Sequence, residues 1–487
     1  MRPSILIDRL KKLFKSLEVS SDVIMDDARQ RHLIATPNST YKYMVDHMRC
    51  CADGKPGSDL WWQIYNWYFD HNSWDVKRKA LLEGLFHRNQ EAPIGKNRAV
   101  DLYSASIRAS VSRLEQYVNC PFAHFVRYGL RPRERKMYTV AAPDLGELFH
   151  RSIEGFTRKL AEDNLNWRDL DDKQCETMID EVMDNILPDH NHGILLSTNR
   201  YKYLANRLKR ISKRAIWLLT DHVKRSNFTP IGHEISFGVR GSYPPIEIEL
   251  NNGEHMLLEG RIDRADIYRE GEDVYINVID YKSGFENFDL SDAYFGLKLQ
   301  LLVYLEALLD VEQRHITGKA KPGGIFYFKI DDPLIDTQEQ MADAIQNEIR
   351  KKLKLKGLVL KDVNIVKRMD SYINGNSEVL PLGVKKDDTF YANSSVLGEE
   401  EFFDLLGHVR HLIKDIGTEM LKGKIRIEPV KKGDNTACKY CPFDGICQFD
   451  NQLEDNGYKL IHKLSGEEVI KRITNGKEES GDGELDG

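Results

Sequence analysis

The sequence predicts an α/β fold in which a mixed central sheet is flanked by helices and preceded by a helical N-terminal region. Residues 273 to 281 and 323 to 330 are nearly continuous apolar runs rich in β-branched and aromatic types, as is typical of buried strands. Between them, residues 296 to 309 have the amphipathic spacing of a helix. This alternation of strand, helix and strand predicts a sheet covered by helices.

Three regions differ in composition along the 487 residues. Residues 1–105 look mostly helical, and we interpret the aromatic cluster near residues 61 to 68 as core. Residues 106–465 contain the predicted sheet, a long basic helix at 198 to 226 and two further helices at 337 to 353 and 399 to 422. Residues 466–487 are acidic and poor in apolar side chains, so we expect a disordered tail.

Composition excludes a membrane protein. The chain is 41% hydrophobic and 30% charged, and no run of eighteen apolar residues could span a bilayer. Seven cysteines in a large chain without a signal peptide make a disulfide framework a poor interpretation, so we expect a soluble protein in a reducing cytoplasm. No G-x-x-x-x-G-K-[ST] loop occurs, so the chain has no ATPase or helicase motif.

Charge is unevenly distributed. The net charge of -6 is unlike that of a dedicated nucleic-acid binder, but residues 200 to 225 hold nine Lys or Arg against one acid, Asp221. Such a helix could follow a phosphate backbone. A solvated helix face is an equally good interpretation.

Two carboxylates and an amine are predicted to meet at one end of the sheet. Residues two apart in a strand share a face, so Asp280 and Lys282 project together, while Tyr281 points to the other side. Residues 257 to 263 read as a neighbouring strand that brings Asp263 alongside. Mg²⁺ or Mn²⁺ takes oxygen ligands and keeps several waters, and Lys282 could orient the attacking water. The pattern predicts a metal-dependent nuclease, although ordinary strand-end ion pairs are the alternative for so short a motif.

Residues 259 to 304 resemble the RecB-like branch of the PD-(D/E)xK nuclease superfamily. Its pattern runs G-R-I-D-R, I-D-Y-K-[ST]-G and Q-L-x-x-Y, and the three blocks stand in this order from Gly260, Ile279 and Gln300. The resemblance implies a restriction-endonuclease-like core. It also implies that Asp263, Asp280 and the Tyr281 carbonyl bind the metal, that Lys282 is catalytic, and that Gln300 and Tyr304 contact the substrate or position the lysine.

A histidine is the further metal ligand that this resemblance implies. Residues 144 to 150 are predicted to begin a helix, with Pro143 suited to its first turn. In RecB-like nucleases a G-x-x-x-H histidine binds metal, and Gly146 and His150 have that spacing. Taken alone, a helix histidine is more often core or surface. Glu234 stands where these nucleases often have an acid, and we assign it a supporting role.

Four cysteines form a candidate centre for a soft metal. Cys438, Cys441 and Cys447 have the spacing C-x2-C-x5-C, and Cys120 lies far upstream, at the end of a helix that a Ser112 and Glu115 capping box predicts. By spacing alone, structural zinc is a fair competitor. Residues 110 to 135 resemble the AddB family of helicase-nuclease subunits, in which this S-V-S-R-L-E-x-Y-x-x-C-P-F cysteine is the first ligand of an iron-sulfur cluster. The resemblance implies a 4Fe-4S cluster that closes the nuclease domain into a ring.

The resemblance also implies a function. It indicates a DNA exonuclease that cuts single-stranded ends, acts beside an AddA-like helicase subunit, and serves double-strand-break repair by recombination. Residues 1–105 would then be the end of a preceding helicase-like region, and the chain a C-terminal portion. Two alternatives stay open: a non-catalytic iron-sulfur scaffold that binds DNA, and a stand-alone iron-sulfur exonuclease akin to the CRISPR-adaptation nucleases.

Overall fold

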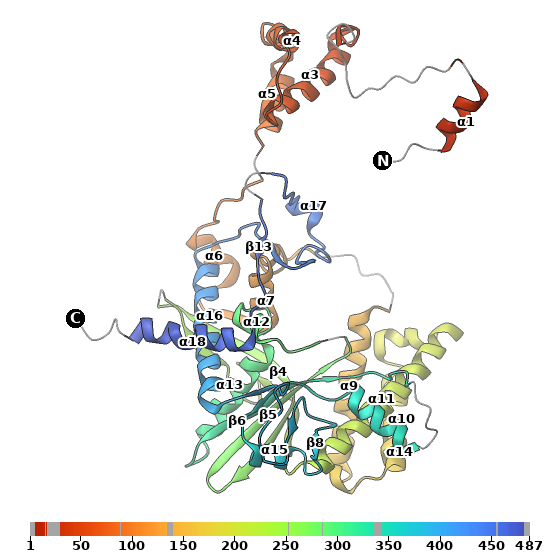
Figure 1. The fold of residues 1–487 in the computed structure, drawn as a ribbon, viewed down its shortest axis with the longest axis vertical. Coiled ribbons are helices and arrows are strands. Elements are labelled where there is room, and N and C mark those ends of the chain that lie inside the picture. The colour runs from red at the N-terminus through yellow and green to blue at the C-terminus, as the bar shows by residue number, and fades with distance from the viewer. Residues whose placement is uncertain are drawn as a thin grey trace. The chain divides into compact units, whose positions relative to one another are not determined.

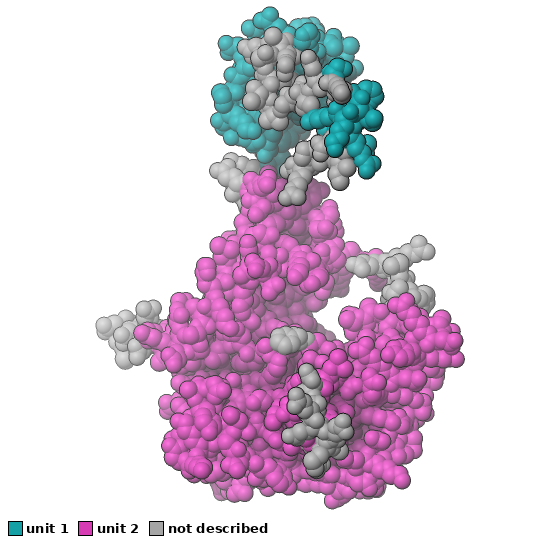
Figure 2. All heavy atoms as spheres, turned by 45° about the vertical axis from the view of Figure 1, so that its right-hand side comes forward, with its two compact units in different colours: residues 1–89 teal, residues 90–487 magenta. Residues whose placement is uncertain are grey.

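The computed structural model divides the chain into two compact units, residues 1–89 and 90–487 (Figure 2). It describes residues 5–14, 16, 30–87, 89–133, 140–251, 253–284, 286–335, 342–453 and 456–481. Among these residues, no helix is long and apolar enough to cross a membrane.

The first unit is helical. Its small core contains Trp61 and Tyr68, whereas Trp62 and Trp67 of the same aromatic cluster are exposed. The helix at residues 59 to 69 carries apolar side chains on all sides, but only one of its faces packs against the neighbouring helices. The interpretation as core is therefore correct for only part of the cluster. The helices are α1 (Ile5–Leu13), α3 (Pro37–Ala52), α4 (Asp59–Phe69) and α5 (Asp75–Leu85).

The second unit is built on a mixed sheet, which confirms the predicted fold class. The described strands pair in the order β1-β4-β5-β6-β7-β10, and β2 and β3 also pair with β4. Strands β4 and β5 are antiparallel, whereas β5 and β6 are parallel and joined through helix α13. The strands are β1 (Ile107–Ser110), β2 (Thr229–Phe237), β3 (Ile246–Glu249), β4 (His255–Glu270), β5 (Asp273–Lys282), β6 (Ala320–Lys329), β7 (Lys356–Leu360) and β10 (Val396–Leu397).

Helices cover both faces of this sheet (Figure 1). α13 lies against the face that carries Asp280 and Lys282, while α11 lies against the face that carries Tyr281 and Phe328. The helices are α6 (Lys96–Tyr103), α7 (Val111–Asn119), α8 (Pro121–His124), α9 (Ala142–Glu162), α10 (Asp172–Ile186), α11 (Asn199–Arg225), α12 (Leu290–Tyr294), α13 (Gln300–Gln313), α14 (Ala342–Lys352), α15 (Val363–Met369) and α16 (Glu399–Leu421). Part of the helix predicted at 337 to 353 lies outside the described residues.

The basic helix α11 is largely neutralised within the fold. Lys213 forms an ion pair with Asp180 at 2.6 Å, and Lys209 pairs with Asp184, both acids being on α10. Arg210 pairs with Asp332 at 2.6 Å. These contacts favour the interpretation of α11 as a structural helix over that of a free phosphate-binding face.

Short elements complete the unit. The bounds are β8 (Gly375–Asn376), β9 (Gly383–Val384), β11 (Val430–Lys432), β12 (Asn435–Thr436), α17 (Asp444–Cys447), β13 (Lys459–Leu460) and α18 (Gly466–Gly481). Helix α18 corrects the prediction of a disordered tail over 466–487, because Val469 and Ile473 are buried in the main core. These two side chains stand one helical turn apart and face the core, and residues 482–487 lie outside the described residues.

Candidate active site

Asp263, Asp280 and Lys282 meet at one rim of the sheet, where the strand pattern predicts them. The Oδ2 atom of Asp263, on β4, accepts a hydrogen bond from the Tyr281 N–H, on β5, at 2.6 Å. The Nζ atom of Lys282 lies 2.7 Å from Oδ2 of Asp280. Both carboxylates are buried, so little water screens their charges from each other.

Tyr281 has two different roles in this geometry. Its ring points to the opposite face, where it packs against Phe328 and its hydroxyl lies 3.4 Å from Nδ1 of His233. Its backbone N–H holds Asp263 in place. The Tyr281 carbonyl as a metal ligand stays a prediction.

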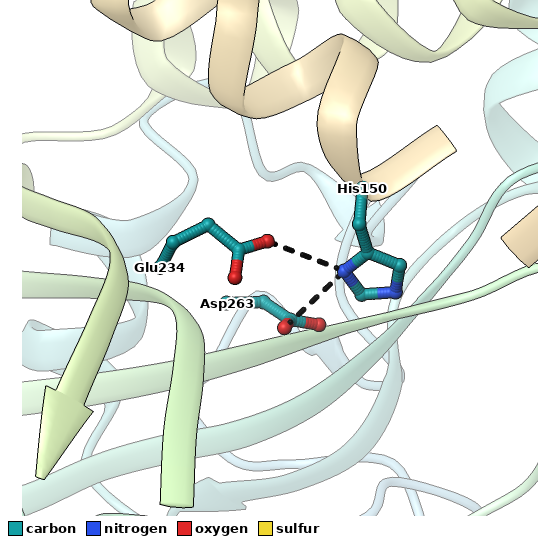
Figure 3. Close-up of side chains that lie close together, drawn as sticks. All are labelled: His150, Glu234 and Asp263. Atoms are coloured by element: carbon teal, nitrogen blue, oxygen red, sulfur yellow. Dashed lines mark hydrogen bonds and ion pairs between the residues drawn. The ribbon is translucent and has the colours of Figure 1, made fainter. Parts of the chain in front are cut away.

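A second group of ligand atoms adjoins this pair. Nδ1 of His150, on α9, lies 3.4 Å from Oδ1 of Asp263 and 3.4 Å from Oε1 of Glu234, and the three side chains point toward one another (Figure 3). Their ligand atoms all lie within 4.8 Å of one another. Two carboxylates and one imidazole suit a hard or intermediate divalent ion such as Mg²⁺ or Mn²⁺ better than a soft one.

Glu234 is one of the three candidate metal ligands in the structure, whereas the sequence indicated only a supporting role. It stands in strand β2 with a φ of +54°, a left-handed conformation that is unusual for a side chain of this size. Its neighbours His233 and Ile235 pair with Arg264 and Ile262, so Glu234 lies opposite Asp263 on β4. Strained backbone of this kind gathers at functional sites. The only sequence signal for this residue was its place just before the sheet, where RecB-like nucleases often have an acid.

The charges of the site favour bound protons or cations. Burial lowers the pKa of His150, but hydrogen bonds to Asp263 and Glu234 outweigh it and raise the pKa to about 10. Burial, together with the charge of Asp263, raises the pKa of Asp280 to about 7, against the opposing effect of Lys282. Negative charge is therefore concentrated where a cation would relieve it.

Gln300, the first residue of α13, joins the two catalytic candidates of β5. Its Nε2 donates to Oδ1 of Asp280 at 2.7 Å, and its Oε1 accepts from Nζ of Lys282 at 3.0 Å. Nε2 also lies 3.1 Å from the hydroxyl of Tyr304, one helical turn further on. The structure thus brings Gln300 and Tyr304 to the site and makes the amide a brace between acid and amine.

Gly260 is required by close packing at this brace. A Cβ atom there would lie 2.7 Å from the ring of Phe237 and 3.0 Å from the ring of Tyr304. The glycine of the G-R-I-D block therefore lets Tyr304 approach strand β4.

The four cysteines lie around one small cavity. Cys120 follows α7, and Cys438, Cys441 and Cys447 come from the segment around α17. Burial, together with the nearby Cys447 and Cys441, raises the pKa of the Cys120 thiol to about 11. Phe443 packs against Cys120 in a separate apolar cluster. The structure therefore brings the distant cysteine to the other three.

The spacing of the sulfur atoms bears on which centre fits. A tetrahedral zinc ion with Zn–S bonds of about 2.3 Å would hold each pair of sulfurs about 3.8 Å apart. Within the described residues, no three of these sulfurs all lie within 4.8 Å of one another. The cysteines do not stand in the geometry of a single zinc site in this structure, and both zinc and an iron-sulfur cluster stay predictions.

The helix before Cys120 is capped differently from the prediction. Ser110, not Ser112, caps α7 by accepting a hydrogen bond from the Arg113 N–H. Glu115 instead reaches another element, where its Oε1 accepts from the Leu299 N–H at 2.7 Å. The capping-box pattern missed this because the partner of Glu115 is distant in sequence.

Comparisons with known proteins identify the family. Residues 108–448 match the model of the PD-(D/E)XK nuclease superfamily, and residues 26–84 match the fifth domain of the ATP-dependent helicase/deoxyribonuclease AddB. The chain is 54% identical over 97% of its length to a subunit of an ATP-dependent helicase/deoxyribonuclease from Alkaliphilus metalliredigens, and covers 41% of that relative. Proteins with the same name from a Thermoanaerobacter species and Clostridium acetobutylicum are 41% and 39% identical over 99% of this chain, which covers 42% of each.

The chain spans about two fifths of the length of these curated relatives. The family match covers most of the chain and includes the sheet, the carboxylates and all four cysteines. The chain therefore belongs to the PD-(D/E)XK nuclease superfamily.

Proposed function

We propose that the chain is the nuclease portion of an AddAB-type helicase-nuclease, and that it hydrolyses DNA as an exonuclease with Mg²⁺ or Mn²⁺. The observation that carries the proposal is the convergence of His150, Glu234 and Asp263 beside the Asp280–Lys282 pair. Metal ligands, a buried acid and a positioned amine within one site are the parts that phosphodiester hydrolysis needs.

His150, Glu234 and Asp263 would hold the cation, with Asp280 alongside. When bound, the cation offsets the negative charge that develops on the phosphate and favours deprotonation of an attacking water. Lys282 presents its amine to the scissile phosphate or to the water. Gln300 keeps that amine beside Asp280, because the same amide side chain contacts both groups.

Substitution at the sheet rim tests the activity. Asp280→Ala and Lys282→Ala should each abolish Mn²⁺- or Mg²⁺-dependent cleavage of a labelled single strand while leaving DNA binding in place. Asp273→Ala and Lys321→Ala are matched controls, because they remove an Asp–Lys pair at 2.8 Å that lies on β5 and β6 but at the opposite end of β5. Cleavage that persists in both rim variants rules out the proposed site. Binding without any cleavage by the unaltered protein selects the DNA-binding scaffold.

The substrate and partner are part of the proposal. The relatives are named as subunits of an ATP-dependent helicase/deoxyribonuclease, so we infer that an AddA-like subunit delivers single-stranded ends to this site during double-strand-break repair. Co-purification with such a subunit, and faster cleavage of duplex ends when that subunit is supplied with ATP, would support the assignment. A stand-alone exonuclease would cleave without any such stimulation.

We also propose a 4Fe-4S cluster on Cys120, Cys438, Cys441 and Cys447. Support comes from their shared cavity, in which Cys120 lies beside the three cysteines of the segment around α17. Anaerobically purified protein should contain iron and absorb visible light, and Cys441→Ala should lose both signals. Cys50→Ala, a half-exposed cysteine of the first unit, is the control. Zinc in place of iron would refute the cluster.

A further inference from the structure

We propose that a groove beside strand β7, here called the lysine groove, binds the single DNA strand that leads to the catalytic rim. This inference rests on the proposed nuclease function and names the surface that its substrate follows. The groove has a volume of about 1500 Å³. It lies between the segment after β5, the end of α14 with β7, and the start of α18.

The lysine groove carries an excess of positive charge. In the described part of the chain, seven lysines and three acids line it. Asp289 and Lys463 pair with each other at 3.0 Å, and Lys351 pairs with Glu348 at 2.8 Å, so five of these lysines and two of these acids lie outside the two pairs. A concave surface of one sign concentrates its field and attracts a polyanion.

Lys354 and Lys356 are half-buried within this positive surface. Burial lowers the pKa of both amines, and the neighbouring Lys329 lowers that of Lys356 further. A phosphate bound between the two amines would favour their charged forms and so raise both pKa values again. On α11, Lys209 and Lys213 form ion pairs with acids of α10.

The sheet register places the groove next to the catalytic rim. Asp280 on β5 is paired with Tyr327 on β6, and Tyr327 is paired with Lys356 on β7. Adjacent strands are about 4.8 Å apart, so the backbone of Lys356 lies roughly 10 Å from that of Asp280. The segment that follows Lys282 supplies Asn287 and Phe288 to the facing wall. A strand lying in the groove would therefore reach the acids without leaving the surface.

An exposed aromatic ring favours a single strand over a duplex. Tyr391 lines the groove with 37% of its surface exposed, and its backbone N–H is held by the Gly383 carbonyl at 3.0 Å. A ring on a fixed loop can stack with a base only when that base is unpaired. The volume also exceeds that of a pocket for one small ligand, so several nucleotides fit.

Binding measured without hydrolysis tests the inference. The double variant Lys354→Gln with Lys356→Gln removes both charges and keeps much of each side-chain stem. The probe is a fluorescent oligothymidylate of about twenty nucleotides in EDTA, titrated between about 50 and 200 mM salt. We expect a several-fold loss of affinity and a salt slope smaller by about 1.4, or about 0.7 for each lost phosphate contact. Tyr391→Ala should lower affinity without changing that slope.

Controls separate this inference from the proposed function. Lys209→Gln with Lys213→Gln also removes two lysines, and it should bind the oligonucleotide like the unaltered protein. Unchanged affinity and slope in the folded groove variant would overturn the inference. So would a groove variant that loses binding only to polyglutamate, because the groove would then fit an acidic protein partner. Cleavage of the same oligonucleotide by the unaltered protein in Mn²⁺ tests the proposed function separately.

Discussion

Glu115 is predicted to position the catalytic amide from a distance. It lies on α7, the helix that ends at Cys120, and its carboxylate accepts from the Leu299 N–H at the start of α13. Gln300, the next residue, bridges Asp280 and Lys282. The helix that precedes Cys120 is therefore hydrogen-bonded to the residue next to Gln300.

The magnitude follows from that contact. A side chain that caps a helix N-terminus contributes about 1 kcal/mol, and a hydrogen bond to a charged group about 1.5 to 3 kcal/mol. Glu115→Ala should therefore lower the free energy of unfolding by about 1 to 3 kcal/mol. A brace displaced by about 1 Å can slow catalysis by up to about a hundredfold. We expect kcat to fall by at least about tenfold, with little change in KM.

The assay is steady-state cleavage of a labelled single strand, together with urea unfolding of the same preparations. Glu115→Gln keeps an acceptor oxygen, so it should retain most of the rate that Glu115→Ala loses. Glu154→Ala, which removes a half-buried glutamate from an ion pair with Arg158 on α9, is the control. A folded Glu115→Ala protein with an unaltered kcat would refute the positioning role. Equal damage from both Glu115 variants would show that charge, rather than the hydrogen bond, matters.

Three further predictions concern the brace, the pH dependence and the C-terminal helix. Gln300→Leu removes the amide between Asp280 and Lys282, so kcat should fall by about tenfold or more, a loss of about 1.4 kcal/mol in transition-state binding, in the same cleavage assay; an unchanged kcat would contradict the brace. Burial lowers the pKa of His124 and His222 to about 3, so the unfolded chain binds more protons below pH 6.5 and stability falls with acidity. Urea unfolding should show about 1 kcal/mol lost per histidine between about pH 7 and 5.5, and His222→Gln should reduce that slope. Ile473→Ala should destabilise the second unit by about 2 to 5 kcal/mol in urea unfolding, because Ile473 is buried in the core; an unchanged free energy of unfolding would contradict the packing of α18 there.

Local patterns in the sequence were enough to predict the central elements. The alternation of side chains along a strand places Asp280 and Lys282 on one face, and the four-residue spacing of a helix places Gln300 beside Tyr304. Both patterns depend only on backbone geometry within one element. They survive folding because packing against neighbours does not change the period of a strand or helix.

Contacts between elements were decided by the tertiary structure alone. Glu234 lies beside His150 and Asp263 because of the pairing register of β2 with β4 and the positive φ of Glu234. Neither feature can be read from the residues next to it in the sequence. Glu115 matched a local capping pattern but bonds to Leu299 instead. Val469 and Ile473 of α18 are buried in the core, although the acidic composition of this segment predicted disorder. The lysine groove likewise gathers residues from separate segments, so its charge is visible only after the chain has folded.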